Sequence, residues 1–347
     1  MSDSTRRAGD LPLVTALINT YNYGHFVEQA IESVLAQDYP RERVEILVVD
    51  DGSTDDTAAR VKKYGERVRY LAKINGGQAS AFNFGFARAK GAIIAFLDAD
   101  DYWLPGKLSR VVRAFEELPT AGLVYHRRTE LSSETGAFSE GDFAQCSGFL
   151  PDDLKGLLEY RVLPTSSLAF SRGVLDRMMP MPEWIRLQAD AYLEALVVFL
   201  APVSAVGEVL SVYRVHGKNL FAANRHNVRE RAKHLSMCRD IFDAAKKWLK
   251  RHEFDLRRKE IEIFFEQLFL FLEADEFVLR APTRARFLRY MRRYTKLYWT
   301  RDPWKLRIMN IFNTVAGPLV GYGQFSGLYQ AEVRAIGFLR RLTGGHS

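Results

Sequence analysis

The sequence predicts an α/β fold in which a mostly parallel sheet is covered by helices on both faces. Short apolar runs rich in β-branched residues recur between residues 13 and 125. Segments with helically spaced apolar residues separate these runs, and clusters of acidic or polar residues follow several of them. Strands that alternate with helices favour parallel pairing, because a crossover helix must carry the chain back between neighbouring strands.

The strands are expected at residues 13–18 (LVTALI), 44–49 (VEILVV), 68–72, 92–97 (AIIAFL) and 122–125. The two clearest helices between them are expected at residues 26–35 and 78–89. After the second strand, Ser53 or Thr54 is expected to cap another helix, with Asp55 and Asp56 at its positive end.

The later part of the chain predicts a different organisation. Residues 127–151 are polar and contain glycine, which indicates a loop region that can include a hairpin. Residues 164–171 and 203–215 look strand-rich, and helical periodicity dominates from about residue 224. We therefore expect a flexible N-terminus over residues 1–10, an α/β domain over 11–222 and a helical, basic region over 223–347.

Composition and charge narrow the class of protein. The two cysteines, Cys146 and Cys238, cannot form a disulfide framework, which predicts a reducing, cytoplasmic compartment. Neither a signal peptide nor a conventional transmembrane span is expected. The chain carries a net charge of +7, yet residues 277–347 alone hold 13 Lys/Arg and only 2 Asp/Glu. Such a basic tail predicts an anionic partner, either lipid headgroups or nucleic acid.

Carboxylates follow two of the predicted buried strands. Because ligands of parallel sheets bind beyond the carboxyl ends of the strands, these clusters mark the candidate site. Asp98 and Asp100 form a DxD pattern that can hold Mg²⁺ or Mn²⁺, hard cations that prefer oxygen ligands. Asp50 and Asp51 can accept a hydrogen bond from a base or a ribose hydroxyl. In the simpler interpretation, both clusters are solvated turns that cap helices.

Four motifs in order resemble the family 2 glycosyltransferases, which are inverting enzymes of the GT-A fold. They are residues 17–22 (LINTYN), 48–55 (VVDDGSTD), 75–85 (NGGQASAFNFG) and 96–101 (FLDADD), the last followed by LPGKL at 104–108. The resemblance covers about residues 13–217. The glycine patterns GxGxxG and GxxxxGK[ST] are absent from the sequence, which argues against a dinucleotide-binding or P-loop enzyme.

The resemblance implies a role for each matching residue. Those expected to bind the donor nucleotide and its ribose or diphosphate are Thr20, Tyr21, Asn22, Asp50, Asp51, Asn75, Gly76, Gln78 and Asp98. Asp100 would bind the divalent metal, and His216 would ligate the metal or donate to the leaving phosphate. Many relatives have arginine where this chain has Phe82, so another cation must compensate near the donor.

The same resemblance places the general base about 80–100 positions after the DxD pattern. Asp190 fits this spacing and is our candidate, with a helix N-cap as its alternative role and Glu183 and Glu194 as rivals. The hydroxyl residues Thr165, Ser166 and Ser167 are expected to face the acceptor. Arg214 and Lys218 flank His216 and can add positive charge.

The predicted function is transfer of a sugar, with inversion, from a nucleotide sugar such as a UDP-sugar to an acceptor hydroxyl. The acceptor is expected to be a glycan or a lipid-linked molecule in polysaccharide, glycolipid or glycoprotein biosynthesis. Aromatic and basic residues alternate in the tail after residue 292, which predicts peripheral binding to an anionic inner membrane face. An ordinary helical subdomain or an oligomer interface is the alternative role, and no nucleic-acid-binding module is recognised. A nucleotidyltransferase and a non-catalytic nucleotide-sugar-binding module are the alternative functions.

Overall fold

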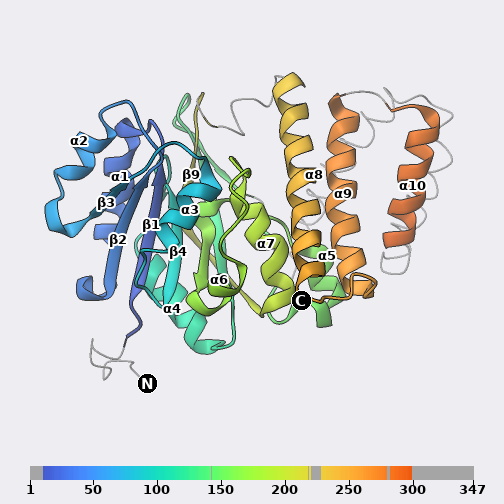
Figure 1. Ribbon diagram of the computed structural model, residues 1–347, viewed down its shortest axis with the longest axis horizontal. Helices are drawn as coiled ribbons and strands as arrows, with labels where there is room; N and C mark the ends of the chain where they lie inside the picture. Colours follow the sequence, from blue (N-terminus) through green and yellow to red (C-terminus); the bar gives the residue numbers. More distant parts are fainter. Residues whose placement is uncertain (1–10, 142, 218, 220–227, 280–281, 299–347) are drawn as a thin grey trace. The chain divides into compact units, whose positions relative to one another are not determined.

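The computed structural model describes residues 11–141, 143–217, 219, 228–279 and 282–298 (Figure 1). They belong to two compact units, each described here by itself. The first consists of residues up to 226 together with 240–261, and the second of residues 227–239 and 262 onward. The helical segment 240–261 therefore groups with the α/β unit. The expected N-terminal segment 1–10 and the tail after residue 298 lie outside the described residues.

A nine-stranded sheet organises the first unit, in the order β3-β2-β1-β4-β8-β6-β9-β5, with β7 beside β6. Its strands are β1 Val14–Thr20, β2 Val44–Asp50, β3 Arg69–Ala72, β4 Ile93–Asp98, β5 Tyr102–Trp103, β6 Leu123–Ser132, β7 Phe138–Glu140, β8 Leu168–Ser171 and β9 Val203–Val215. The strands β3, β2, β1 and β4 are parallel to their neighbours, as a βαβ pattern requires. Beyond β4 the sheet is mixed, because β8 runs antiparallel to both β4 and β6.

The register of the parallel strands assembles polar residues at one edge. Thr20 at the end of β1 is paired with Asp50 at the end of β2, and Asn19 is paired with Asp98 at the end of β4. Since β8 is antiparallel to β4, its first residues lie near the carboxyl end of β4. The 3-10 turn Thr165–Ser167 that precedes β8 therefore adjoins the same edge.

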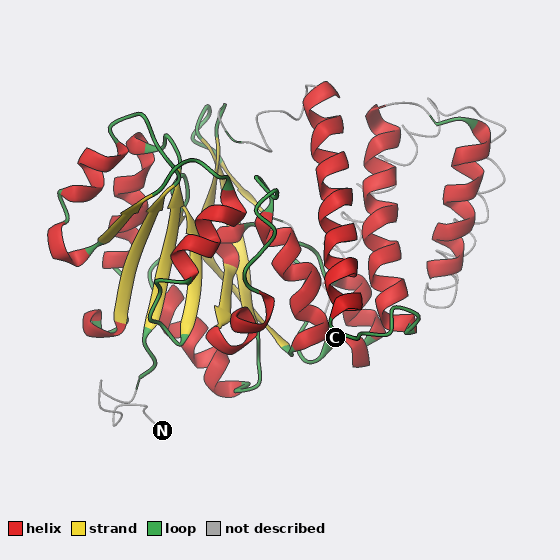
Figure 2. Ribbon diagram, viewed as in Figure 1, coloured by secondary structure: helices red, strands yellow, loops and turns green. Residues whose placement is uncertain are grey.

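Helices cover both faces of the sheet (Figure 2). They are α1 Gly24–Leu35, α2 Thr57–Lys62, α3 Gln78–Phe86, α4 Lys107–Glu117, α5 Leu154–Glu159, α6 Arg172–Met178 and α7 Ala189–Leu200. On one face, α1 buries Val27, Ile31 and Val34, at the spacing expected of a helix with a single apolar stripe. On the other face, a Cβ added to Gly85 of α3 would lie only 2.9 Å from Leu17, so α3 packs tightly on the sheet.

Two expectations about local structure are wrong. The first is the start of the expected loop region at residue 127, because β6 continues to Ser132. The hairpin expected within this region does form, between β6 and β7. The polar segment remains a strand because it pairs with β9 after two register shifts. The second is the helix cap, since α2 begins only at Thr57 and neither Ser53 nor Thr54 caps it. Both residues instead hydrogen-bond Asn22.

Three long helices follow the sheet: α8 Val228–Arg251, α9 Lys259–Leu279 and α10 Arg284–Tyr298. In the second unit, α9 and α10 share a small core that contains Phe277 and Phe287. Arg293 of α10 bridges Glu266 at 2.6 Å and Glu273 at 2.8 Å on α9. Among the described residues, none of the helices combines the length and apolarity that a membrane crossing requires.

Candidate active site

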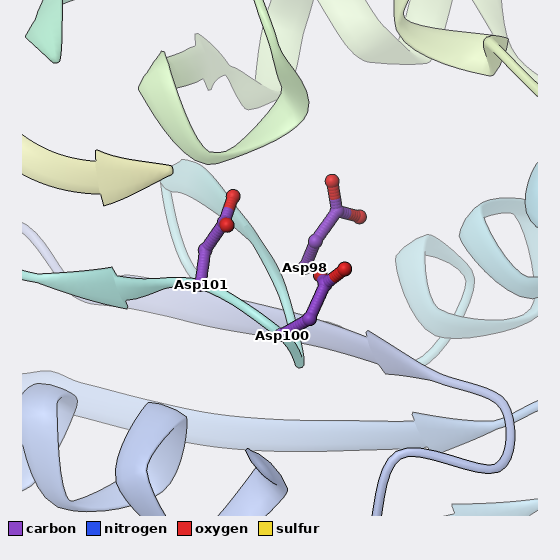
Figure 3. Close-up of side chains that lie close together, drawn as sticks. All are labelled: Asp98, Asp100 and Asp101. Carbon is purple, nitrogen blue, oxygen red and sulfur yellow. The ribbon is translucent and has the colours of Figure 1, made fainter. Parts of the chain in front are cut away.

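Three carboxylates define the centre of the candidate site, and we call Asp98, Asp100 and Asp101 the acidic triad. Asp98 ends β4, and the other two lie in the short loop that leads to β5. Each offers an oxygen atom, and these atoms lie within 4.8 Å of one another. Figure 3 shows the three side chains on the same side of this loop. The spacing fits several carboxylates that share one cation.

Burial and mutual repulsion make this cluster costly in its ionised form. Burial, followed by the charges of Asp100 and Asp190, raises the pKa of Asp98 to about 8. Burial and the same neighbour, Asp100, also hold the pKa of Asp101 well above its usual range. Like charges that lie this close favour either bound protons or a cation. Because all three donors are oxygens, the cluster fits Mg²⁺ or Mn²⁺ better than a soft metal.

Residues at the end of β9 and in the loop after it contact the acidic triad, although they are distant from it in the sequence. His216 Nε2 lies 3.1 Å from Asp100 Oδ2, and the backbone N–H of Arg214 donates to Asp101 Oδ1 at 2.8 Å. The Arg214 guanidinium donates to the backbone carbonyl of Asp100 at 2.9 Å. His216 therefore lies beside Asp100, the carboxylate predicted to bind the metal. Lys218 lies outside the described residues.

Aromatic packing holds this histidine in place. The Tyr23 and Phe26 rings lie 5.7 and 4.9 Å from the His216 imidazole, measured between ring centroids. Burial, together with the charges of Asp100 and Asp98, raises the pKa of the Tyr23 phenol, so this group remains a neutral hydrogen-bond donor. Tyr23 is thus a member of the site that sequence reasoning missed, although it follows directly after the LINTYN motif.

Asp51 and Asp50 use their carboxylates to shape loops. Asp51 Oδ1 accepts from Lys73 Nζ at 2.7 Å and from the backbone N–H of Gly76 at 2.9 Å. Its other oxygen accepts from the N–H of Gly77 at 2.7 Å. Asp50 accepts from the Tyr70 hydroxyl and from the backbone of the DGSTD turn. Both carboxylates are buried and fix the loops on either side of the site.

The loop after β1 leaves an aromatic ring open to solvent. Asn22 adopts a left-handed conformation (φ 57°), which asparagine tolerates better than most residues. Its side chain accepts from the backbone N–H of Thr54, and its own N–H donates to Ser53 Oγ, both at 2.8 Å. Tyr21, the residue before it, has 47% of its surface exposed. Thr20 is buried, and its hydroxyl finds no partner within the described part of the chain.

The NGGQ segment connects α3 with the loop before α7. Gln78 Oε1 accepts from the backbone N–H of Ala189 at 2.9 Å, and the Asn75 amide oxygen accepts from Arg186. Phe82 is buried against Phe96, with ring centroids 4.7 Å apart, so it belongs to the core. It therefore does not take the place of the arginine that many relatives have at this position. Arg186 is exposed at the same loop and was not singled out from the sequence.

Asp190 lies in the first turn of α7 and is bound to the Thr165–Ser167 turn. Its Oδ2 accepts from the Thr165 hydroxyl at 2.9 Å and from the Thr165 N–H at 3.1 Å. Burial raises the pKa of this carboxyl above its usual range, which suits a general base. Glu194 is fully buried and accepts from Tyr160 and Leu163, so an acceptor has no access to it. Glu183, the other rival, is exposed.

The three hydroxyl residues expected to face the acceptor lie in the interior. Thr165, Ser166 and Ser167 are 1%, 2% and 0% exposed, respectively. The Ser166 hydroxyl donates to Asp101 Oδ2 at 2.6 Å, and Thr165 holds Asp190 as described above. Their burial places them beneath the acidic residues and not at a surface where an acceptor binds. The direction of β8, which the sequence did not reveal, is the cause.

Asp101 and Asn19 are further members of the site that sequence reasoning did not assign. Asn19 Nδ2 donates to Asp98 Oδ1 at 2.8 Å. The signals for both were adjacent to recognised motifs: Asp101 directly follows the DxD pattern, and Asn19 lies inside LINTYN. Asn219 approaches Asp100 at 3.4 Å and was also not assigned, although it lies only three residues after His216.

Comparisons with known proteins show which proteins this chain is similar to. The model of the family described as "Glycosyl transferase family 2" matches residues 15–167. An uncharacterized glycosyltransferase of Nostoc sp. is 36% identical over 217 residues, which are 59% of this chain and 66% of that protein. An uncharacterized glycosyltransferase of Rickettsia bellii is 36% identical over 129 residues, 37% of this chain and 18% of that protein. The chain thus spans less than two thirds of these relatives.

Among solved structures, S. aureus TarS 1–349 in complex with UDP-GlcNAc has a similar fold. The TM-score is 0.60 at 17% sequence identity, and the likeness covers 83% of this chain and 81% of that one. The expected α/β fold of GT-A type is therefore confirmed. At this level of identity, the likeness shows a shared fold and does not show which ligands this chain binds.

Proposed function

We propose that this chain, which belongs to glycosyltransferase family 2 through residues 15–167, transfers a sugar from a nucleoside diphosphate donor to an acceptor hydroxyl. The observation that carries this proposal is the convergence of the acidic triad with Asp190. The Thr165–Ser167 turn is hydrogen-bonded to both groups. One group can hold a cation against a diphosphate, and the other can accept a proton.

The acidic triad would hold Mg²⁺ or Mn²⁺, with His216 beside Asp100. When bound, such an ion neutralises negative charge that develops on a diphosphate leaving group. The ring of Tyr21 is exposed at the end of β1, which suits stacking on a base. TarS binds UDP-GlcNAc, and a UDP-sugar is therefore the first donor to test.

Asp190 acts as general base in this proposal. Its carboxylate takes the proton of the acceptor hydroxyl while that oxygen attacks the anomeric carbon and the bond to the diphosphate breaks. A single displacement of this kind inverts the anomeric configuration. The two hydrogen bonds from Thr165 orient the carboxylate, and burial raises the pKa of this group above its usual range.

A donor panel tests the proposal. Purified full-length chain is incubated with UDP-, GDP- and dTDP-sugars and Mn²⁺, and release of the nucleoside diphosphate is measured with and without EDTA. We expect metal-dependent release from one donor class, and loss of that activity in Asp100→Asn. Binding of a nucleotide sugar without release or transfer to any glycan or lipid-linked acceptor supplied would instead support a non-catalytic binding module.

Membrane association and oligomerisation remain predictions. Most of the aromatic and basic tail lies outside the described residues, but α10 exposes Arg289, Arg292 and Lys296. Co-sedimentation with anionic and neutral vesicles tests a peripheral location at the inner membrane face. We expect the protein to sediment with anionic vesicles only. Equal amounts of protein in the supernatants of both vesicle types contradict the prediction.

A further inference from the structure

The Thr165–Ser167 turn lies at the junction of the two halves of the site. All three of its residues are buried, although each carries a hydroxyl group. Buried hydroxyls are expensive unless they are hydrogen-bonded, and two of these three bond to carboxylates of the candidate site. Such an arrangement indicates a function in holding those carboxylates.

Ser166 provides the contacts on the side of the acidic triad. Its hydroxyl donates to Asp101 Oδ2 at 2.6 Å and accepts from the backbone N–H of Asp98 at 3.1 Å. One oxygen atom therefore connects the first and last members of the triad. A second interaction closes the other side, because the backbone N–H of Arg214 holds Asp101 Oδ1.

Thr165 provides the contacts on the side of Asp190. Its hydroxyl and its N–H both donate to Asp190 Oδ2. Gln78 Nε2 approaches the same hydroxyl at 3.3 Å, and Gln78 Oε1 receives the N–H of Ala189 at the start of α7. Consecutive residues of one turn are thus bonded to the base and to the triad, so a shift of the turn moves both groups.

A buried lysine anchors this turn from below. Lys107 is completely buried, and its Nζ donates to the carbonyl oxygen of Ser166 at 2.7 Å. Its Nζ also lies 4.0 Å from the centroid of the Trp103 ring, and burial lowers the pKa of this amino group well below its usual range. A buried polar group is tolerated only where it is hydrogen-bonded, so the position of Lys107 fixes that of the Ser166 carbonyl.

We propose that the Thr165–Ser167 turn positions the metal-binding carboxylates and the general base relative to each other, with Ser166 as the positioning residue for Asp101, Thr165 for Asp190 and Lys107 as the anchor. This inference rests on the proposed function. It assigns no contact with substrate to the turn. Hydrogen-bonding partners behind metal ligands typically change metal affinity by about 10- to 100-fold when they are removed.

The test separates the two ends of the turn by two readouts. Mn²⁺ alone is titrated into the full-length chain by calorimetry, and turnover is measured with the donor found in the panel. Ser166→Ala is expected to weaken Mn²⁺ binding by about 10-fold. The Thr165 side chain also lies close enough to Asp98 to influence the pKa of that carboxyl. Thr165→Val is therefore expected to weaken Mn²⁺ binding less than Ser166→Ala does, and to lower kcat about 10-fold at unchanged donor KM. Thr165→Ser restores the hydroxyl and should restore kcat.

Ser211→Ala is the matched control. Ser211 is equally buried, and its hydroxyl has no partner among the residues that the structure describes. This variant should change neither readout. Equal Mn²⁺ affinity in Ser166→Ala and the wild type, or equal losses in Ser166→Ala and Ser211→Ala, overturns the inference while the proposed function stands. Absence of Mn²⁺ binding by the wild-type chain overturns the inference together with the metal site.

Discussion

Replacing Asp190 by asparagine tests the chemistry with little change in shape. In the wild type, Thr165 donates two hydrogen bonds to Asp190 Oδ2, and the amide oxygen of the asparagine can accept both. The amide nitrogen then faces the N–H of Ala191, and the bond that this N–H donates to Oδ1 at 2.9 Å is lost. One lost hydrogen bond costs about 1 kcal/mol, which lowers Tm by about 2–4 °C in a domain of this size.

A second effect of the substitution opposes this loss. The negative charge of Asp190 is one cause of the raised pKa of Asp98, so removing it relieves repulsion within the site. We therefore expect Asp190→Asn to fold and to unfold within a few degrees of the wild type. Donor binding should be preserved as well, because a general base acts on the acceptor during the reaction.

Catalysis should respond quite differently. A positioned general base contributes about 10²- to 10⁴-fold, so kcat should fall by that factor at nearly unchanged donor KM. The measurement is steady-state release of nucleoside diphosphate, with calorimetry for donor binding. Asp176→Asn, an exposed change of the same type on α6, is the control and should retain full activity. Turnover by Asp190→Asn within about 10-fold of the wild type refutes the assignment.

Three further predictions concern protonation and backbone shape. Mn²⁺ should raise Tm, and this rise should grow between about pH 6 and pH 9. The reason is that carboxylate ligands must lose their protons to bind the metal, and the pKa of Asp98 lies at about 8. A rise in Tm that does not depend on pH contradicts the triad as the metal site. Burial raises the pKa of Glu194, so its contribution to stability is present at low pH and is lost as pH rises through that raised value. Glu194→Gln removes this dependence, and urea unfolding should show the wild type losing stability relative to the variant as pH rises; parallel curves contradict this. Gly77→Ala should lower Tm and donor affinity, because φ is 89° and an added Cβ would lie 2.6 Å from the Arg186 Cα; thermal unfolding that matches the wild type contradicts the described loop.

Much of the fold follows from local patterns in the sequence. Apolar runs of strand length that alternate with helically spaced segments predict parallel strands and crossover helices, and β1 to β4 form in this way. Their parallel register alone brings Thr20, Asp50 and Asp98 to one edge of the sheet. The sequence therefore determines where the carboxylates gather, because strand ends are local features and parallel pairing aligns them.

The rest depends on tertiary structure. Nothing local to Thr165, Ser166 and Ser167 reveals that β8 enters the sheet antiparallel to β4, which buries their hydroxyls beneath the triad. Likewise, no motif indicates that Lys107 hydrogen-bonds the carbonyl of Ser166, which lies 59 positions away in the sequence. Local sequence patterns are enough to predict the strand ends and the acidic residues that follow them. The partners that orient those residues depend on long-range packing, because short-range periodicity does not encode side-chain direction and burial.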